Sequence, residues 1–168
     1  MLTRAKTITA AVVIVSCLAA NRASAQQDFS FATPAGQTVT IASMRGRVVV
    51  LLFSGVQDPQ CREGLKALEA LADRFQGKDV RMYWVSVNSL AEASNEQLGT
   101  PCGVASSVPV LRDTNQTAFK RFSGKRSQLP TIVVLDRQGN LVGQPRGGFN
   151  PNSDFINDLA VTIDKQLK

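Results

Sequence analysis

The stretch VVVLLFSGVQDPQCRE, residues 48–63, contains the strongest structural signal in the chain. Its first six residues, 48–53, form a continuous apolar run that is typical of a strand buried on both faces of a sheet. Asp58 and Pro59 are favoured residues at the start of a helix, Asp58 as the N-cap and Pro59 as the first helical residue. The stretch therefore predicts a central strand followed by a helix that carries Cys61 on its first turn.

Alternating strand and helix patterns continue through the rest of the chain. The helix that begins near Cys61 has an apolar stripe at a spacing of three and four residues, made by Leu65, Leu68, Leu71 and Phe75. Two extended runs within 29–44 predict an N-terminal β-hairpin. Further strands are expected at 80–87, 108–111, 131–136 and 141–143, and further helices at 90–98, at 116–122 and along the C-terminal segment 155–167. This order predicts an α/β fold with a mixed sheet flanked by helices.

The first 25 residues have the pattern of a signal peptide. Arg4 and Lys6 precede an apolar run at 8–20, and Ala23-Ser24-Ala25 is a small-residue cleavage site. We therefore expect one domain at 26–168, in the periplasm or secreted. An alternative is that 14–17, which resembles a lipobox, is cleaved before Cys17 and that a lipid on this cysteine anchors the protein to a membrane.

Composition removes several classes of site. The chain has no histidine, which excludes Ser-His-Asp and Cys-His nucleophiles and histidine-ligated metals. Only Cys61 and Cys102 remain after cleavage, too few for a cysteine-rich metal cage. We expect no metal and no cofactor, and what remains is either thiol chemistry or no chemistry. The net charge falls from +6 to +3 when the basic residues of the signal are removed, and we expect no nucleic-acid partner.

From about Phe29 to the C-terminus the chain resembles the exported thioredoxin-like redoxins, the TlpA-like and AhpC/TSA group. The segments that match in order are the hairpin with Gly36, Arg45-Gly46-Arg47 before the buried strand, Pro59-Gln60-Cys61-Arg62, 109–113, and Leu129-Pro130-Thr131 before 132–139. The resemblance implies a thioredoxin-like fold with a cis peptide bond at Leu129-Pro130, and a Pro130 that lies against the active-site cysteines. It also implies partners that are protein thiols and disulfides, or a peroxide.

The chain departs from the family pattern at its active-site motif. The first cysteine of the usual Cys-x-x-Cys is replaced by Asp58, and the tryptophan before it by Gln57. The buried acid of thioredoxin falls on Leu52, which cannot titrate. Because no second thiol stands two residues away, the ordinary exchange cycle of that motif is not open to Cys61.

Three interpretations of Cys61 compete. In the first, Asp58 caps the helix and Cys61 is a small buried residue. In the second, Cys61 is a reactive thiol whose thiolate is favoured by the helix dipole and Arg62 and opposed by Asp58. Peroxiredoxins place a peroxidatic cysteine at this point, with Thr at the position of Asp58 and a proline at the position of Ser54.

In the third interpretation Cys61 forms a redox disulfide with Cys102. Topology argues against this pairing, because a returning helix at 90–98 would place Cys102 at the opposite end of the sheet from Cys61, as a free thiol or an intermolecular handle.

The resemblance favours an exported redoxin enzyme, a thiol-disulfide oxidoreductase or antioxidant protein that acts through the single cysteine Cys61. Asp58, Arg62 and Pro130 are the candidate residues around it. The alternative is a catalytically degenerate module that binds or assembles with a partner in the groove between Asp58 and Pro130.

Overall fold

A computed structural model describes residues 28–124, 128–147 and 153–168. The expected signal peptide and Cys17 lie outside these residues. The strands are β1 (Ser30–Ala32), β2 (Thr38–Thr40), β3 (Val48–Ser54), β4 (Val80–Ser86), β5 (Val110–Arg112), β6 (Thr131–Leu135) and β7 (Arg146–Gly147). The helices are α1 (Ile41–Met44), α2 (Cys61–Arg74), α3 (Thr117–Ser123) and α4 (Ser153–Leu167), with two 3-10 turns, η1 (Gln97–Gly99) and η2 (Pro101–Gly103).

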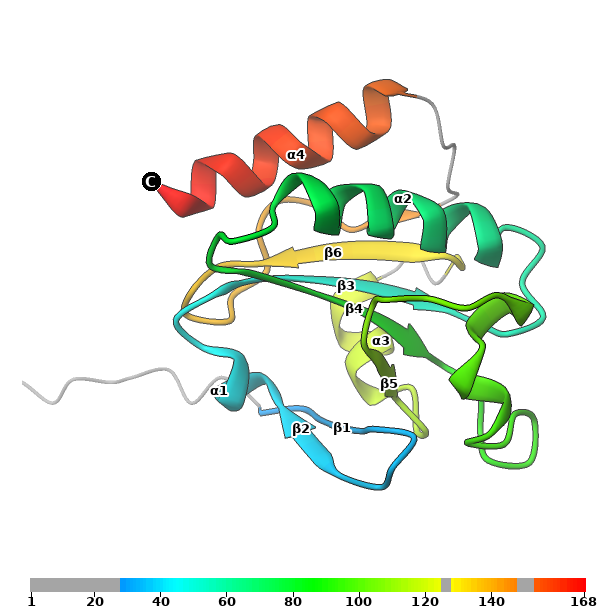
Figure 1. Ribbon diagram of the computed structural model, residues 1–168. Coiled ribbons are helices and arrows are strands. Elements are labelled where there is room, and N and C mark those ends of the chain that lie inside the picture. The colour runs from blue at the N-terminus through cyan, green and yellow to red at the C-terminus, as the bar shows by residue number, and fades with distance from the viewer. Residues whose placement is uncertain (1–27, 125–127, 148–152) are drawn as a thin grey trace, which may run out of the picture.

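The strands form one mixed sheet in the order β2-β1-β5-β4-β3-β6-β7. The central strand β3 runs parallel to β4 and antiparallel to β6, and β1 and β2 form the N-terminal hairpin. Helices α2 and α4 cover one face of the sheet and α3 lies on the other (Figure 1). The predicted mixed sheet, its flanking helices and the hairpin are confirmed.

The apolar run of β3 is buried on both faces because its side chains alternate between two core clusters. Val48, Val50 and Leu52 point into the cluster beneath α2 and α4. Val49, Leu51 and Phe53 point into the cluster that contains the aromatic side chains of α3. The strand therefore fixes α2, and with it Cys61, against the middle of the sheet.

The segment between β4 and β5 differs from the expected structure. A helix was predicted at 90–98, but the segment consists of turns followed by η1 and η2. The apolar periodicity of a helix is weak here, and Leu90 is exposed whereas Ala93 and Leu98 are buried. Because no helix forms here, the chain does not run back along the sheet before it reaches Cys102.

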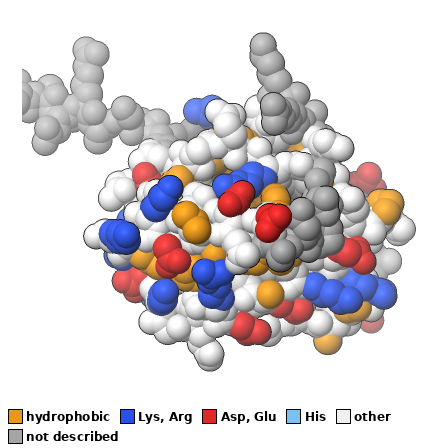
Figure 2. Space-filling model, turned by 90° about the horizontal axis from the view of Figure 1, so that it is seen from above, with side chains coloured by type: hydrophobic (Ala, Val, Ile, Leu, Met, Phe, Trp, Pro, Cys, Tyr) orange, Lys and Arg blue, Asp and Glu red, His pale blue; other side chains and the backbone are white. Residues whose placement is uncertain are grey.

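The face formed by α2 and α4 carries basic and acidic side chains that are interspersed with isolated hydrophobic ones (Figure 2). Two of the ion pairs, Lys78 with Asp164 and Arg137 with Asp79, have N–O distances of 3.5 Å. Within 28–124, 128–147 and 153–168, no helix has the length and hydropathy needed to cross a membrane.

Candidate functional site at the Cys61–Cys102 disulfide

The loop between β3 and α2 is held in a fixed shape by the neighbouring strand. The side-chain Oδ1 of Asn88, just after β4, accepts a hydrogen bond of 2.9 Å from the backbone N–H of Val56. Within the loop, the N–H of Asp58 donates to the carbonyl of Gly55 at 3.1 Å, and the N–H of Cys61 donates to the carbonyl of Asp58 at 3.0 Å. These bonds place Cys61 at the carboxyl end of the central strand.

The start of α2 differs from the prediction. The helix begins at Cys61, and its N-cap residue is Gln60, whose side chain makes no capping hydrogen bond. The carboxylate of Asp58 accepts instead from the backbone N–H of Gln60, at 2.9 Å, in a turn before the helix. The predictions that Asp58 is the N-cap and Pro59 the first helical residue are therefore wrong, and the first turn of α2 has no side-chain cap.

Cys61 is joined to Cys102 by a disulfide. Their Cα atoms are 5.6 Å apart, within the usual range for such a bond. The prediction that Cys102 lies at the opposite end of the sheet is wrong. No returning helix forms at 90–98, so η2 stays near the carboxyl ends of β3 and β4 and contacts α2, and the chain returns only after Cys102 (Figure 1).

Arg112 of β5 holds the segment that leads to Cys102. Its Nη1 donates to the carbonyls of Asn88 and Ser89 at 3.0 and 3.2 Å, and its Nη2 donates to the carbonyl of Ala93 at 2.8 Å and to Oδ1 of Asn95 at 3.1 Å. The residue is only 3% exposed. Burial lowers the pKa of this guanidinium because it penalises the charged form.

A cavity of about 290 Å³ opens beside the disulfide. Its lining residues come from the loop before α2, from the first turn of α2 and from η2, and they are Val56, Asp58, Pro59, Cys61, Arg62, Glu63 and Cys102. Cys61 is 2% exposed, whereas Cys102 is half-buried. The cavity therefore brings Asp58 and Arg62 together with both sulfurs, as candidate site residues.

Pro130 lies at the same edge of the sheet. The Leu129-Pro130 peptide bond is cis, as the resemblance implies. Pro130 is buried directly before β6, whose first residue Thr131 is paired with Phe53 near the carboxyl end of β3. It does not belong to the lining of the cavity beside the disulfide.

The other chemical features of the site are those of a thiol centre. Leu52, at the position of the family's buried acid, is fully buried in the core. Among the residues that the structure describes, no three His, Cys, Asp or Glu side chains gather in a way that could hold a metal ion. Among the groups that line the cavity, the two sulfurs are the ones that can be oxidised and reduced.

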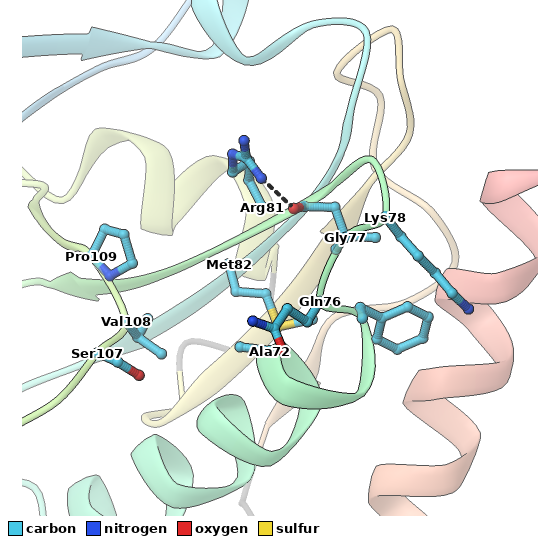
Figure 3. Close-up of a pocket in the computed structure, with 11 residues that line it drawn as sticks. Ala72, Gln76, Gly77, Lys78, Arg81, Met82, Ser107, Val108 and Pro109 are labelled. Atoms are coloured by element: carbon cyan, nitrogen blue, oxygen red, sulfur yellow. Dashed lines mark hydrogen bonds between the residues drawn. The ribbon is translucent and has the colours of Figure 1, made fainter.

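A second cavity, of about 340 Å³, lies where α2 ends and β4 begins, beyond the far end of the helix from Cys61. Met82, Val108 and Ala72 form its apolar wall (Figure 3). Its charged members are Lys78 and Arg81, and Nη1 of Arg81 donates to the carbonyl of Val80 at 3.2 Å. The lining of this cavity contains no cysteine, so the disulfide cavity is the stronger candidate site for thiol chemistry.

The strand order, the cis-proline loop and a cysteine at the start of α2 define a protein of the thioredoxin-like fold. The sequence profile of the AhpC/TSA family matches residues 23–144, and the chain belongs to this family. No curated protein matches it in sequence.

Solved structures share the fold at low sequence identity. A candidate thiol:disulfide interchange protein DsbE from Chlorobium tepidum is 20% identical with a TM-score of 0.69, over 84% of this chain and 94% of that one. The exposed lipoprotein thioredoxin Etrx1 from Streptococcus pneumoniae is 22% identical with a TM-score of 0.64, over 80% and 98%. A candidate protein disulfide isomerase from Bacteroides thetaiotaomicron is 21% identical with a TM-score of 0.66, over 83% and 86%.

The sequence singles out Cys61 and allows Cys102 as its disulfide partner, but the expected topology argued wrongly against this pairing. One signal was present: Cys102 is the one other cysteine of the expected mature chain. The chain before Cys102, however, is held at 88–95 by hydrogen bonds from Arg112, and no sequence pattern shows these.

Proposed function

We propose that this protein is an exported thiol-disulfide oxidoreductase that cycles between a Cys61–Cys102 disulfide and the corresponding dithiol. The disulfide at the start of α2 is the observation that carries the proposal. It provides a second sulfur where the sequence has no Cys-x-x-Cys, so the single-cysteine mechanism is not required. Membership of the AhpC/TSA family suggests protein thiols and disulfides as substrates.

The position of the bond supports exchange rather than a purely structural role. The bond lies in an open cavity with one half-buried cysteine, not between two fully buried ones. The first turn of α2 also has no side-chain cap, so the partial positive charge of the helix N-terminus is free to stabilise a thiolate on Cys61. Arg62 adds a positive charge to the same cavity, while Asp58 and Glu63 oppose it.

A stoichiometric exchange experiment tests this function. Oxidised protein, residues 26–168, is mixed with an equal amount of a reduced peptide dithiol, and thiols and disulfides of both molecules are counted by mass spectrometry. We expect the peptide to become oxidised as Cys61 and Cys102 become thiols. A Cys61→Ala/Cys102→Ala double variant is the control and should leave the peptide reduced. A native protein whose disulfide the peptide never reduces would contradict the proposal and leave a structural disulfide in a binding module.

Peroxide reduction is a second candidate, favoured by the position of Cys61, where peroxiredoxins keep their peroxidatic cysteine. In the reduced protein, Cys61 thiolate would take one oxygen from a peroxide to give a sulfenic acid and an alcohol or water. Cys102 thiol would then condense with it, releasing water and forming the disulfide. The test is sulfenate formation on Cys61 in a Cys102→Ser variant treated with hydrogen peroxide. A Cys61 that stays a thiol would exclude this activity.

Export is a separate part of the proposal. Fusion of residues 1–25 to a reporter that is active only outside the cytoplasm tests it, with Arg4→Glu/Lys6→Glu as the control that reverses the N-terminal charge. Exported reporter and cleavage after Ala25 are expected. Cleavage before Cys17 with attached lipid would support a membrane-anchored form instead.

A further inference from the structure

The two sulfurs of the disulfide differ in how they can be approached. Cys61 is 2% exposed and belongs to the core cluster beneath α2, with Leu65 and Leu68. Cys102 lies in η2, is half-buried, and has exposed neighbours at Gly99, Thr100 and Gly103. An incoming thiolate must reach a sulfur from the side opposite the bond that breaks. The burial of Cys61 closes that approach on its side, whereas Cys102 is only half-buried and lies beside the cavity.

The backbone conformation at Cys102 also places this residue in a tight turn beside the cavity. Its φ is 57°, in the left-handed region, and the following Gly103 has a φ of 70°. A non-glycine residue adopts this region only where the surrounding structure requires it. Two successive left-handed residues make a tight turn at the rim of the cavity, and Cys102 is part of this rim.

The two sulfurs differ again as leaving groups. Cys61 is the first residue of a 14-residue helix whose N-terminus has no side-chain cap. A thiolate formed there is stabilised by the helix dipole, and a more stable thiolate leaves faster. Cys102 lies in a three-residue turn, which provides no comparable stabilisation.

From these differences we propose, resting on the function proposed above, that Cys102 is the cysteine that exchanges with substrate and Cys61 is the buried partner. A substrate thiolate attacks Sγ of Cys102. The substrate–Cys102 bond forms, the Cys61–Cys102 bond breaks, and the electron pair leaves on Sγ of Cys61.

The substrate's second thiolate then attacks its own sulfur in the mixed disulfide and expels Cys102 as a thiolate. The products are a substrate disulfide and, after proton uptake by both protein sulfurs, a Cys61/Cys102 dithiol. Two electrons pass from the substrate to the protein. In the reverse direction Cys102 attacks a substrate disulfide and Cys61 resolves the intermediate. The exchanging cysteine thus comes from the β4–β5 segment and not from the first position of a Cys-x-x-Cys.

Mapping the first mixed disulfide tests this assignment. Oxidised protein is mixed with reduced glutathione, quenched with acid within the first turnover, alkylated in denaturant and digested for mass spectrometry. We expect glutathione on Cys102 and the alkyl label on Cys61. Glutathione on Cys61 with the label on Cys102 would overturn the assignment while leaving the proposed exchange function intact. A disulfide that glutathione never opens in the folded protein would overturn both.

A matched pair of single variants provides an independent measurement. Cys61→Ala retains only Cys102 and Cys102→Ala retains only Cys61, and circular dichroism establishes that each is folded. With oxidised glutathione as the probe, we expect Cys61→Ala to form the mixed disulfide at least about tenfold faster than Cys102→Ala, because only its sulfur is accessible. Equal rates, or faster reaction of Cys102→Ala, would contradict the assignment.

Discussion

The side chain of Arg112, the last residue of β5, links the irregular segment 88–95 to the sheet. It donates four hydrogen bonds to the segment 88–95, three of them to backbone carbonyls, from a nearly fully buried position. That segment leads into η1 and η2, so Arg112 fixes the first part of the path that the chain takes from β4 toward Cys102.

Replacing Arg112 should destabilise the fold. Arg112→Met keeps much of the apolar volume but leaves the carbonyls of Asn88, Ser89 and Ala93 without these donors. We expect a loss of roughly 3 kcal/mol in the free energy of unfolding, measured by urea denaturation of oxidised protein. Arg121→Met, at an exposed position on α3, is the matched control and should change stability by less than about 0.5 kcal/mol. Equal effects of the two variants would show that the hydrogen bonds of Arg112 do not support the segment.

The charge of Asp58 should slow exchange at the neighbouring sulfurs. Asp58→Asn retains an oxygen that can accept from the N–H of Gln60 but removes a negative charge from the cavity. Because glutathione is an anion, we expect its reduction of the disulfide to accelerate roughly two- to threefold at low salt, and the gain to shrink at high salt. Glu69→Gln, on α2 but outside the cavity lining, is the control. An unchanged rate for Asp58→Asn at low salt would rule out this electrostatic role.

At the scale of elements, the turn after β6 packs against α1. Gly139 has a φ of 87°, and a Cβ added to it would lie 2.9 Å from Cγ2 of Ile41. The strand expected at 141–143 does not form and is reduced to an isolated bridge between Leu135 and Leu141, beside which the N–H of Val142 donates to the carbonyl of Val134 at 2.8 Å. This turn therefore joins β6 to the N-terminal elements through a position that accepts only glycine.

Gly139→Ala should cost about 2 kcal/mol of stability, the sum of a left-handed backbone penalty and a close contact with Ile41. Gly99→Ala is the control, since a Cβ there meets nothing within 4 Å and its φ is not in the left-handed region. We expect the midpoint of thermal unfolding to fall for Gly139→Ala and to stay unchanged or rise slightly for Gly99→Ala. A neutral Gly139→Ala would mean that α1 moves away from the turn.

Regular elements could be predicted from the sequence, and the irregular segment between β4 and β5 could not. The apolar run 48–53 and the stripe of Leu65, Leu68 and Leu71 carry their own periodicity, so local sequence specified β3 and α2. The segment 88–95 is held by side-chain bonds from Arg112, which lies beyond it in the chain. Its true path brings Cys102 to Cys61, and the predicted helix at 90–98 led to the opposite conclusion.

The start of α2 is a second feature that the local sequence predicted only in part. Asp58 and Pro59 are the right residue types for a helix start, but the carboxylate of Asp58 bonds to Gln60 and the helix begins two residues later than predicted. Residue preferences located the start of α2 to within two residues. The turn at Asp58 then determined at which residue the helix begins and that its first turn has no side-chain cap.

At the scale of the whole molecule, the disulfide joins two segments separated by 41 residues. Reduction therefore removes a constraint on the unfolded chain that is worth about 4 kcal/mol in the chain-entropy description. We expect the urea midpoint to fall by the corresponding amount when folded protein is reduced. The Cys61→Ala/Cys102→Ala variant should not respond to the reductant. A midpoint that is independent of redox state would indicate that the unfolded chain keeps the two segments together.

The proposed exchange requires a disulfide that opens in the native protein, and the dependence of its reduction rate on urea concentration tests this most directly. The rate of reduction by excess glutathione is followed by acid quenching and mass spectrometry, alongside the global unfolding rate under the same conditions. We predict a reduction rate that exceeds the unfolding rate in the absence of urea and changes little until the unfolding transition begins. A rate that equals the unfolding rate at every urea concentration would contradict the account, because the disulfide would then react only in unfolded protein.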